Sequence, residues 1–211
     1  MKKLLRYDKE KEFVFIDCET FNLCLNSCHN LPWQIAMLKV KGDKIVDSKD
    51  FYIKWDTHLK IGKEAAKITR YSPSRMEKRG LPPEEVFPTI EDWLDNSDFV
   101  VGHNVLGFDI YLIKGFYDYM EKDYKHLTSK VIDTLPLSRG IKLDSHIVDG
   151  ESLTEYQYRM LETRRKGVRT NLKAMGLYFN IEHEYDELHN ALVDLKLNLK
   201  VWNKIKWQAE I

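Results

Sequence analysis

The sequence predicts an α/β fold in which a mixed five-stranded sheet is flanked by helices. Three strand-like segments follow one another near the amino end, and helical and strand-like segments then alternate. The chain has 211 residues, of which 43% are hydrophobic, so it is long enough to bury a sizeable core. We find no internal repeat, low-complexity tract or linker, and we expect one domain over residues 1–211.

The first strand is expected at Phe13–Thr20, where the residues are apolar and β-prone. Trp33–Val40 and Lys44–Lys54 follow as a hairpin, because Lys41-Gly42-Asp43 between them favours a turn. These three strands are expected to be antiparallel. Two shorter strands complete the predicted sheet, at Phe99–His103 and at Val131–Thr134.

Helices are expected between and after these strands. Residues 61–79 are predicted to form two short helices, because Tyr71-Ser72-Pro73 interrupts the pattern. Pro82 and Pro83 open another helix, and Phe108–Met120 forms the next one.

The carboxyl-terminal third is harder to interpret. Residues 138–166 are charged and contain two glycines, so we expect an exposed hairpin followed by a helix. Asn171–Met175 is predicted to be a short helix that Gly176 ends. A long amphipathic helix that begins near Asn190 closes the chain.

Charge and composition exclude several classes of protein. Lys and Arg total 33, as do Asp and Glu, so the formal net charge is zero and a basic protein that coats nucleic acid is not expected. No apolar run approaches the ~20 residues of a membrane helix. Residues 1–8 lack the apolar core of a signal peptide, so we expect a cytoplasmic protein without a membrane partner. The odd count of three cysteines argues against a disulfide framework.

Two acidic residues interrupt the first strand. Asp17 and Glu19 are two positions apart, so they share one strand face, roughly 7 Å from each other. Unpaired carboxylates at the edge of a core are costly. A metal ion, a basic partner or a water-filled cleft must therefore compensate them.

Two later stretches carry related residues. One is Val100–Asp109, a short strand followed by a glycine-bounded loop and an acid; the other is His189–Asp194, at the head of the final helix. With Asp17 and Glu19, they resemble the three motifs of the DnaQ-like DEDDh 3′→5′ exonucleases. The resembling segments extend from about Phe13 to Trp202. The resemblance implies a ribonuclease H-like fold.

The resemblance also implies roles for five residues. Asp17, Glu19, Asp109 and Asp194 would hold two divalent ions, and oxygen-only ligands suit Mg²⁺ or Mn²⁺. In this scheme Asp17 bridges both ions, Glu19 and Asp194 hold the ion that carries the attacking water, and Asp109 acts on the second. His189 would be the general base. The related subclass with a tyrosine base needs Tyr where this chain has Asn190.

Three residues are candidate substrate contacts. In the family, a backbone amide and an apolar side chain directly after the first acids hold the terminal nucleotide, which implies this role for Thr20 and Phe21. Phe21 is either a stacking surface for a base or part of the core. Asn104 is the third candidate, and with His103 it is expected to shape the loop around Asp109.

Two other features have alternative interpretations. Asp133 ends a strand, and the family favours a structural role for it, as the cap of the next helix, over a role as a metal ligand. The basic run of Arg164, Arg165, Lys166 and Arg169 is either a solvated surface or a phosphate-contacting edge of the substrate groove.

The motifs therefore predict a metal-dependent 3′→5′ exonuclease that releases nucleoside 5′-monophosphates from single-stranded 3′ ends. DNA is the expected substrate, in proofreading or end trimming, and a polymerase or replication protein would act as a separate chain. The alternative substrate is RNA, as in an exoribonuclease or oligoribonuclease, because the same five residues serve both. An inactive nucleic-acid-binding module of the same fold is the remaining alternative.

Overall fold

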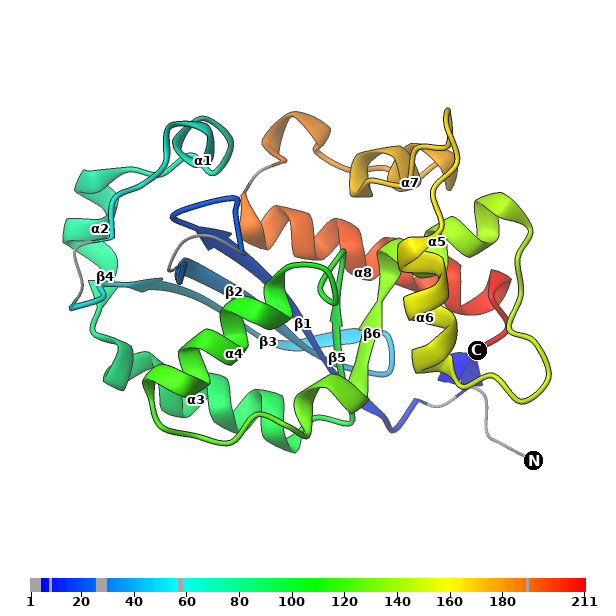
Figure 1. Cartoon of the computed structure of the whole chain (residues 1–211), viewed down its shortest axis with the longest axis horizontal. Coiled ribbons are helices and arrows are strands. Elements are labelled where there is room, and N and C mark those ends of the chain that lie inside the picture. Colours follow the sequence, from blue (N-terminus) through cyan, green and yellow to red (C-terminus); the bar gives the residue numbers. More distant parts are fainter. Residues whose placement is uncertain (1–4, 8, 26–29, 57–58, 189) are drawn as a thin grey trace.

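A six-stranded mixed sheet forms the centre of the computed structural model (Figure 1), which describes residues 5–7, 9–25, 30–56, 59–188 and 190–211. The strand order is β4-β3-β2-β1-β5-β6. The strands are β1 (Glu12–Thr20), β2 (Pro32–Lys41), β3 (Lys44–Ile53), β4 (Gly80–Leu81), β5 (Phe99–Gly102) and β6 (Val131–Asp133).

The α/β, ribonuclease H-like class is confirmed, but the expected number of five strands is wrong. The additional strand, β4, has two residues and pairs in parallel with the end of β3, Gly80 opposite Tyr52 and Leu81 opposite Ile53. Two residues are too few to show an alternating pattern, which is why the sequence did not reveal this strand.

Strand direction brings three strand ends to one edge of the sheet. β1, β2 and β3 are antiparallel neighbours, as the hairpin pattern predicted. β5 is parallel to β1, and β6 is parallel to β5. The carboxyl ends of β1, β5 and β6 therefore point the same way, and the loops that follow them share one edge. Ligands of open α/β sheets bind at such edges.

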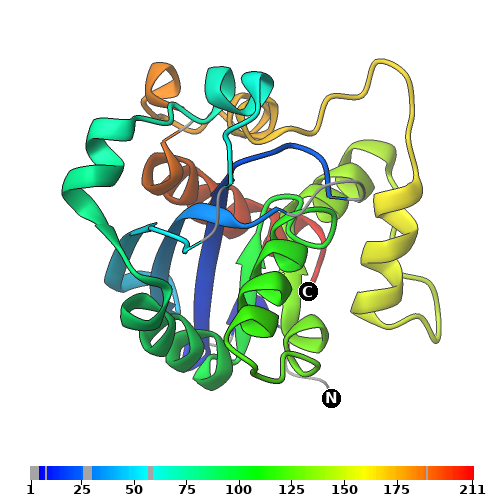
Figure 2. The ribbon, with the colours of Figure 1, turned by 60° about the vertical axis from the view of Figure 1, so that its left-hand side comes forward.

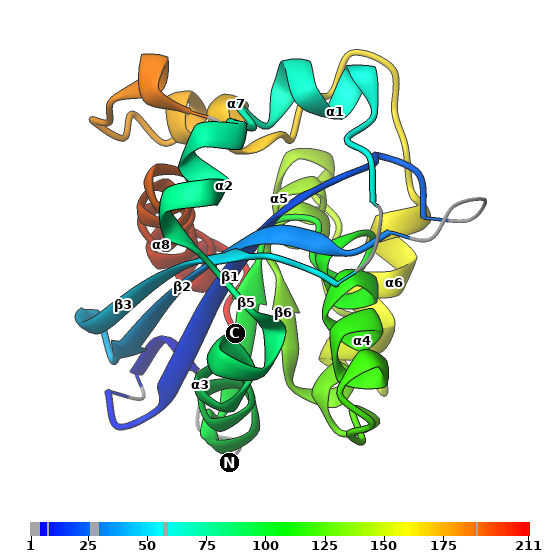
Figure 3. The ribbon, with the colours of Figure 1, turned by 90° about the vertical axis from the view of Figure 1, so that its left-hand side faces the viewer.

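Helices cover both faces of the sheet (Figures 2 and 3). One face is packed by α3 and α4, and the other by α5, α6, α7 and α8. The helices are α1 (Lys63–Ile68), α2 (Pro73–Arg79), α3 (Pro83–Asn96), α4 (Asp109–Tyr119), α5 (Thr134–Leu143), α6 (Leu153–Glu162), α7 (Leu172–Tyr178) and α8 (Ala191–Gln208). Short 3₁₀ turns occur at Leu5–Tyr7, Leu127–Lys130 and Tyr185–Glu187.

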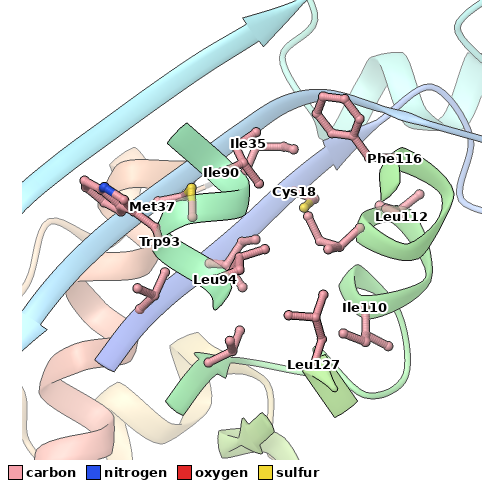
Figure 4. Close-up of a cluster of buried hydrophobic side chains, with 14 of the residues drawn as sticks. Cys18, Ile35, Met37, Ile90, Trp93, Leu94, Ile110, Leu112, Phe116 and Leu127 are labelled. Atoms are coloured by element: carbon pink, nitrogen blue, oxygen red, sulfur yellow. The ribbon is translucent and has the colours of Figure 1, made fainter. Parts of the chain in front are cut away.

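The alternation of side chains along β1 separates the two cores. Val14, Ile16 and Cys18 face α3 and α4, and Figure 4 shows Cys18 with β2 residues beneath these helices. Phe13 and Phe15 face α8 on the opposite side. Each such fully buried side chain contributes about 1.5–3 kcal/mol of hydrophobic stabilisation. A one-residue slip of β1 would exchange the two faces, so burial on both sides fixes its register.

Two glycines were misinterpreted as helix breakers. Residues 134–143 form α5 rather than an arm of a hairpin, and Gly140 lies inside this helix. A Cβ atom at Gly140 would collide with the Tyr156 hydroxyl of α6, so glycine is needed there for helix packing. Likewise, α7 continues through Gly176 to Tyr178. Tyr185 packs against Gly176 in the same way.

Within the described ranges, no helix is both long and apolar enough to cross a lipid bilayer.

Candidate active site

Asp17 and Glu19 lie near the carboxyl end of β1, on the face that α8 covers. This placement follows from the alternation that puts Phe13 and Phe15 on that face. Glu19 is only 9% exposed, and Asp17 is half-buried. The register with β2 shifts between Glu19 and Thr20. This irregularity ends the regular ladder directly after the second acid, as bulges near active sites commonly do.

Asp109 reaches β1 from the neighbouring connection. It is the first residue of α4, where the positive end of the helix dipole favours an anion. Its Oδ1 accepts a 2.9 Å hydrogen bond from the backbone N–H of Cys18, the residue between the two strand acids. The Cys18 thiol is buried and also hydrogen-bonds Asp109, and burial followed by the charge of Asp109 raises its pKa well above the usual range.

Asp194 approaches the same edge from α8. It lies in the first turn of this helix, and its backbone N–H donates to the carbonyl of Asn190 at 2.9 Å. α8 packs against β1 and β2, which fixes the direction of the helix. Asp194 also lines a hollow of about 510 Å³, which we call the active-site hollow; its other lining residues are Arg70, Asn171, Leu172, Lys173, Tyr185, Asp186 and Leu188.

The carboxylates lie close enough together that the charge of one raises the pKa of another. Burial raises the pKa of Asp17 well above its ordinary range, and the charges of Asp109, Glu19 and Asp194 raise it further. Burial, then Asp194 and Asp109, raise the pKa of Glu19 to about 8. Burial is also the main reason that the pKa of Asp109 rises to about 7. Such a cluster is costly when ionised, and cations would relieve the repulsion.

The four carboxylates form an open cluster, not a closed cage. In the part of the chain that the structure describes, no three His, Cys, Asp or Glu side chains already converge tightly enough to hold one metal ion. The chemistry of the donor set nevertheless suits hard cations, because every donor is a carboxylate oxygen.

His189 lies outside the described residues. The structure does place its neighbours: Asn190 is the extended N-cap residue of α8, and Ala191 is the first helical residue. The expectation that the final helix begins at about Asn190 is therefore confirmed, and His189 precedes it in the sequence. The role of His189 as a base stays a prediction.

Thr20 and Phe21 follow directly after the two strand acids. The Thr20 hydroxyl donates to Asn30 Oδ1 and contacts the carbonyl of Leu31. Phe21 is 7% exposed and belongs to a small core with Trp33, with its ring centroid 6.1 Å from that of Tyr71. Both residues are thus held firmly beside the acids, and their contact with substrate stays a prediction.

Asn104 lies in the loop between β5 and α4. Its backbone has φ of 73°, in the left-handed region that Asn tolerates. Its N–H donates to Asp133 Oδ1 at 2.8 Å. The neighbouring His103 donates from Nε2 to the carbonyl of Thr170 at 2.9 Å, because a carbonyl can only accept. Burial lowers the pKa of His103 to about 4, so the ring is neutral near pH 7.

Asp133 has the structural role that was predicted for it. It is the N-cap of α5, and its carboxylate accepts hydrogen bonds from the backbone N–H groups of Asn104, Leu106 and Leu135 at 2.8–2.9 Å. The side chain is fully buried, and burial raises its pKa to about 6 against the opposing effect of these three bonds. It ties the Asn104 loop to β6.

Sequence reasoning missed Arg70 as a site residue. Arg70 lies between α1 and α2, and its Nη2 donates to the carbonyl of Asp186 at 3.3 Å. Its Nη1 is 3.8 Å from the carboxylate of Glu187. Arg70 therefore connects the α1–α2 segment to the turn that precedes α8, and it is one of the residues that line the active-site hollow. It falls in no motif and belongs to no run of basic residues.

Comparison with solved structures gives the same fold at low sequence identity. Escherichia coli exonuclease I in complex with a dT13 oligonucleotide matches with a TM-score of 0.71 and 18% identity, over 93% of this chain and 41% of that one. The zinc-bound form of the same E. coli enzyme with single-stranded DNA matches with a TM-score of 0.74 and 17% identity, over 95% of this chain and 41% of that one. Exonuclease I from Methylocaldum szegediense matches with a TM-score of 0.67 and 19% identity, over 93% of this chain and 40% of that one.

This chain spans about two fifths of the length of those exonuclease I chains. No curated protein matches the sequence. The model of the exonuclease family RNase_T matches residues 14–202, which include all three motifs. The chain therefore belongs to the exonuclease family, with the DnaQ-like, ribonuclease H-like assignment that its motifs predict.

Proposed function

We propose that the protein hydrolyses single-stranded DNA from its 3′ end and releases nucleoside 5′-monophosphates. The observation that supports this most strongly is the clustering of four carboxylates at one edge of the sheet, where Asp17 feels the charges of Asp109, Glu19 and Asp194. Carboxylates that are buried together at such an edge need cations, and phosphodiester hydrolysis uses cations held in this way. The exonuclease I structures with bound oligonucleotide support DNA as the substrate.

In this proposal Asp17, Glu19, Asp109 and Asp194 hold two divalent ions, Mg²⁺ or Mn²⁺. Bound ions would neutralise charge on the phosphate and make the attacking water more acidic. The protein orients the reacting groups through β1 and the amino ends of α4 and α8. Asp109 contributes a position already fixed by its bond to the Cys18 amide.

His189 would take the proton from the attacking water. An imidazole titrates near neutral pH, so it can act as a base while bound cations keep the four carboxylates ionised. Thr20 and Phe21 would contact the terminal nucleotide, because they follow Glu19 directly and are held in place by packing. A 3′-phosphate would then block the reaction, because it adds negative charge beside the acids.

The proposal is tested with a linear dodecanucleotide labelled at its 5′ end, as DNA and as RNA, with Mg²⁺ or with EDTA. We expect a ladder of labelled products shortened from the 3′ end, free mononucleotide when the strand is instead labelled at its 3′-terminal nucleotide, and no reaction in EDTA. A matching circular single strand should stay intact. Cleavage of the circle, or full activity in EDTA, would contradict the proposal. Faster degradation of the RNA strand would replace DNA by RNA as the substrate.

His189→Ala tests the proposed base separately from the acids. We expect turnover to fall roughly 10²–10⁴-fold, which is the usual contribution of a positioned base. Mn²⁺ affinity, measured by calorimetry, should change little, whereas Asp194→Ala should weaken it strongly. His146→Ala is the matched control, because His146 is exposed and lies next to α5. If His189→Ala weakens Mn²⁺ binding as much as Asp194→Ala does, the histidine is a ligand instead.

A further inference from the structure

A second hollow adjoins the active-site hollow. It has a volume of about 550 Å³, and we call it the arginine hollow; its lining includes Asn104, Gly107, Arg139, Leu161, Glu162 and Arg164. Asn171, the N-cap residue of α7, lines both hollows. The two hollows therefore lie on either side of Asn171 at the amino end of α7, with Asp194 lining the first and the Asn104 loop and the end of α6 lining the second.

The side chain of Arg139 lines this hollow and is held in place by hydrogen bonds. It extends from α5, and its Nη1 donates to the carbonyls of Met160 and Leu161 at 2.8 and 2.6 Å. These two bonds use both hydrogens of Nη1, which leaves the N–H groups of Nη2 and Nε for another acceptor. The bonds to the end of α6 also fix the position of the guanidinium, so little side-chain entropy remains to be lost on binding.

The charges around Arg139 favour an added anion. Burial and the positive charge of Arg164 both lower the pKa of Arg139, so the two cations repel each other across the hollow. Glu162 and Asp133 act in the opposite direction. Asp133 already accepts three backbone hydrogen bonds, and Glu162 is exposed. An anion between the two guanidiniums would relieve the repulsion and accept their hydrogen bonds.

The basic run continues this surface beyond the hollow. Arg164, Arg165, Lys166 and Arg169 are exposed in the loop between α6 and α7. The loop is attached to the site at its far end, where the carbonyl of Thr170 accepts the bond from His103. The loop therefore presents cations along a fixed edge of the hollow.

We propose that the arginine hollow and the adjoining loop bind the phosphodiester backbone of the substrate strand, on the 5′ side of the nucleotide that is cleaved. This inference rests on the proposed function, because a strand whose 3′ end lies at Asp194 must leave the active-site hollow in its 5′ direction. The arginine hollow is the neighbouring hollow across Asn171, and its arginines can donate to phosphate oxygens. The substrate class is an extended single strand, longer than the terminal nucleotides.

Binding in the presence of EDTA tests the path without any hydrolysis. The probes are a dinucleotide and a dodecanucleotide of thymidine, each with a 5′ fluorophore, and the readout is anisotropy between about 50 and 200 mM salt. We expect Arg164→Gln to weaken binding of the long probe severalfold. The slope of log K against log salt should become shallower by about 0.7 for each phosphate of a single strand that the variant no longer neutralises. Glu162→Gln should have the opposite effect and tighten binding.

Lys125→Gln is the control that removes the same charge elsewhere. Lys125 is exposed and lies before β6, at the sheet edge opposite the site. Equal weakening by Arg164→Gln and Lys125→Gln, or an unchanged salt slope in Arg164→Gln, would overturn the inference. An Arg164→Gln protein that loses an acidic peptide probe but keeps the oligonucleotide would also overturn it, in favour of a protein partner.

Turnover separates this inference from the proposed function. If the function is correct, Arg164→Gln should reduce the preference of the enzyme for the dodecanucleotide over the dinucleotide severalfold, mainly through KM. If no strand is hydrolysed, the proposed function fails while the binding result still decides whether the path exists.

Discussion

The acids at the ends of β1 and β6 lie at the same edge of one sheet but have opposite environments. Asp133, at the end of β6, is fully buried and accepts three backbone hydrogen bonds. Asp17, near the end of β1, is surrounded by Glu19, Asp109 and Asp194, which raise its pKa. Both acids lose favourable interactions with water when they are buried. Only Asp133 recovers that cost within the protein, through N–H donors.

This difference separates an acid whose hydrogen bonds are satisfied within the protein from an acid that faces other acids. An acid with enough donors stabilises the fold and needs no ligand. Acids that face one another destabilise the metal-free fold and are retained where a cation is to be held. The two kinds of acid can therefore be distinguished by substitutions that change function and stability in opposite directions.

The largest effect is expected for Asp17→Asn. Turnover should fall roughly 10³-fold or more, the scale for loss of a key electrostatic group. In EDTA, however, the variant should be more stable than the parent to urea, because asparagine removes a buried carboxyl group that must either be ionised beside other acids or take up a proton. Steady-state turnover and urea unfolding measure the two effects. Asp149→Asn, at an exposed position between α5 and α6, is the control for a general charge effect. A less stable Asp17→Asn would contradict the comparison.

The next effect is expected for Asp133→Ala. The free energy of unfolding should fall by about 3 kcal/mol, because buried backbone donors lose their acceptor. The fraction that remains folded should still turn over substrate, since Asp17, Glu19, Asp109 and Asp194 are unchanged. Chemical unfolding and turnover per folded molecule are the measurements. If Asp133→Ala melts normally but has no activity, Asp133 belongs with the metal ligands and the distinction fails.

A smaller effect is expected from pH. Because the folded-state pKa values of Glu19 and Asp109 are raised to about 8 and 7, the folded protein binds more protons than the unfolded chain at neutral pH. Stability in EDTA should therefore fall as pH rises from about 6.5 to 8. His103 does not interfere, because its lowered pKa costs stability only below about pH 6.5.

Urea unfolding at several pH values in EDTA and in Mg²⁺ measures this dependence. Mg²⁺ should flatten the decline, since a bound cation favours the ionised carboxylates. Glu19→Gln should also flatten it in EDTA, because one of the titrating groups is removed. A stability that rises over the same pH range would show that the carboxylates are not in contact in the metal-free protein.

The sequence was sufficient where chain-local patterns determine structure. The period of two along β1 correctly separated Val14 and Ile16 from Phe13 and Phe15. Ser72 and Pro73 correctly marked the break between α1 and α2, where the Ser72 hydroxyl accepts from the N–H of Arg75. The order of the acids predicted the family, because each acid lies at an element end that local patterns reveal.

The errors arose where distant packing decides. Gly140 and Gly176 resemble turn residues in the sequence, but both lie inside helices. Glycine is needed at these positions because Tyr156 and Tyr185 leave no room for a side chain. No local rule predicts such a contact. Arg70 was missed for the same reason: its partners at Asp186 and Glu187 are more than 100 residues away in the chain.

The hydrogen bonds between Cys18 and Asp109 make the protein its own reporter of opening between β1 and α4. Cys18 is buried with a raised pKa, whereas Cys24 is exposed, so an alkylating reagent should modify Cys24 quickly and Cys18 only when the strand and the helix separate. With Cys24 and Cys28 replaced by serine, the rate at which Cys18 is labelled measures how often β1 and α4 separate. Protection of this single thiol by divalent ions would then show, without any nucleic acid present, that the ions hold β1 and α4 together.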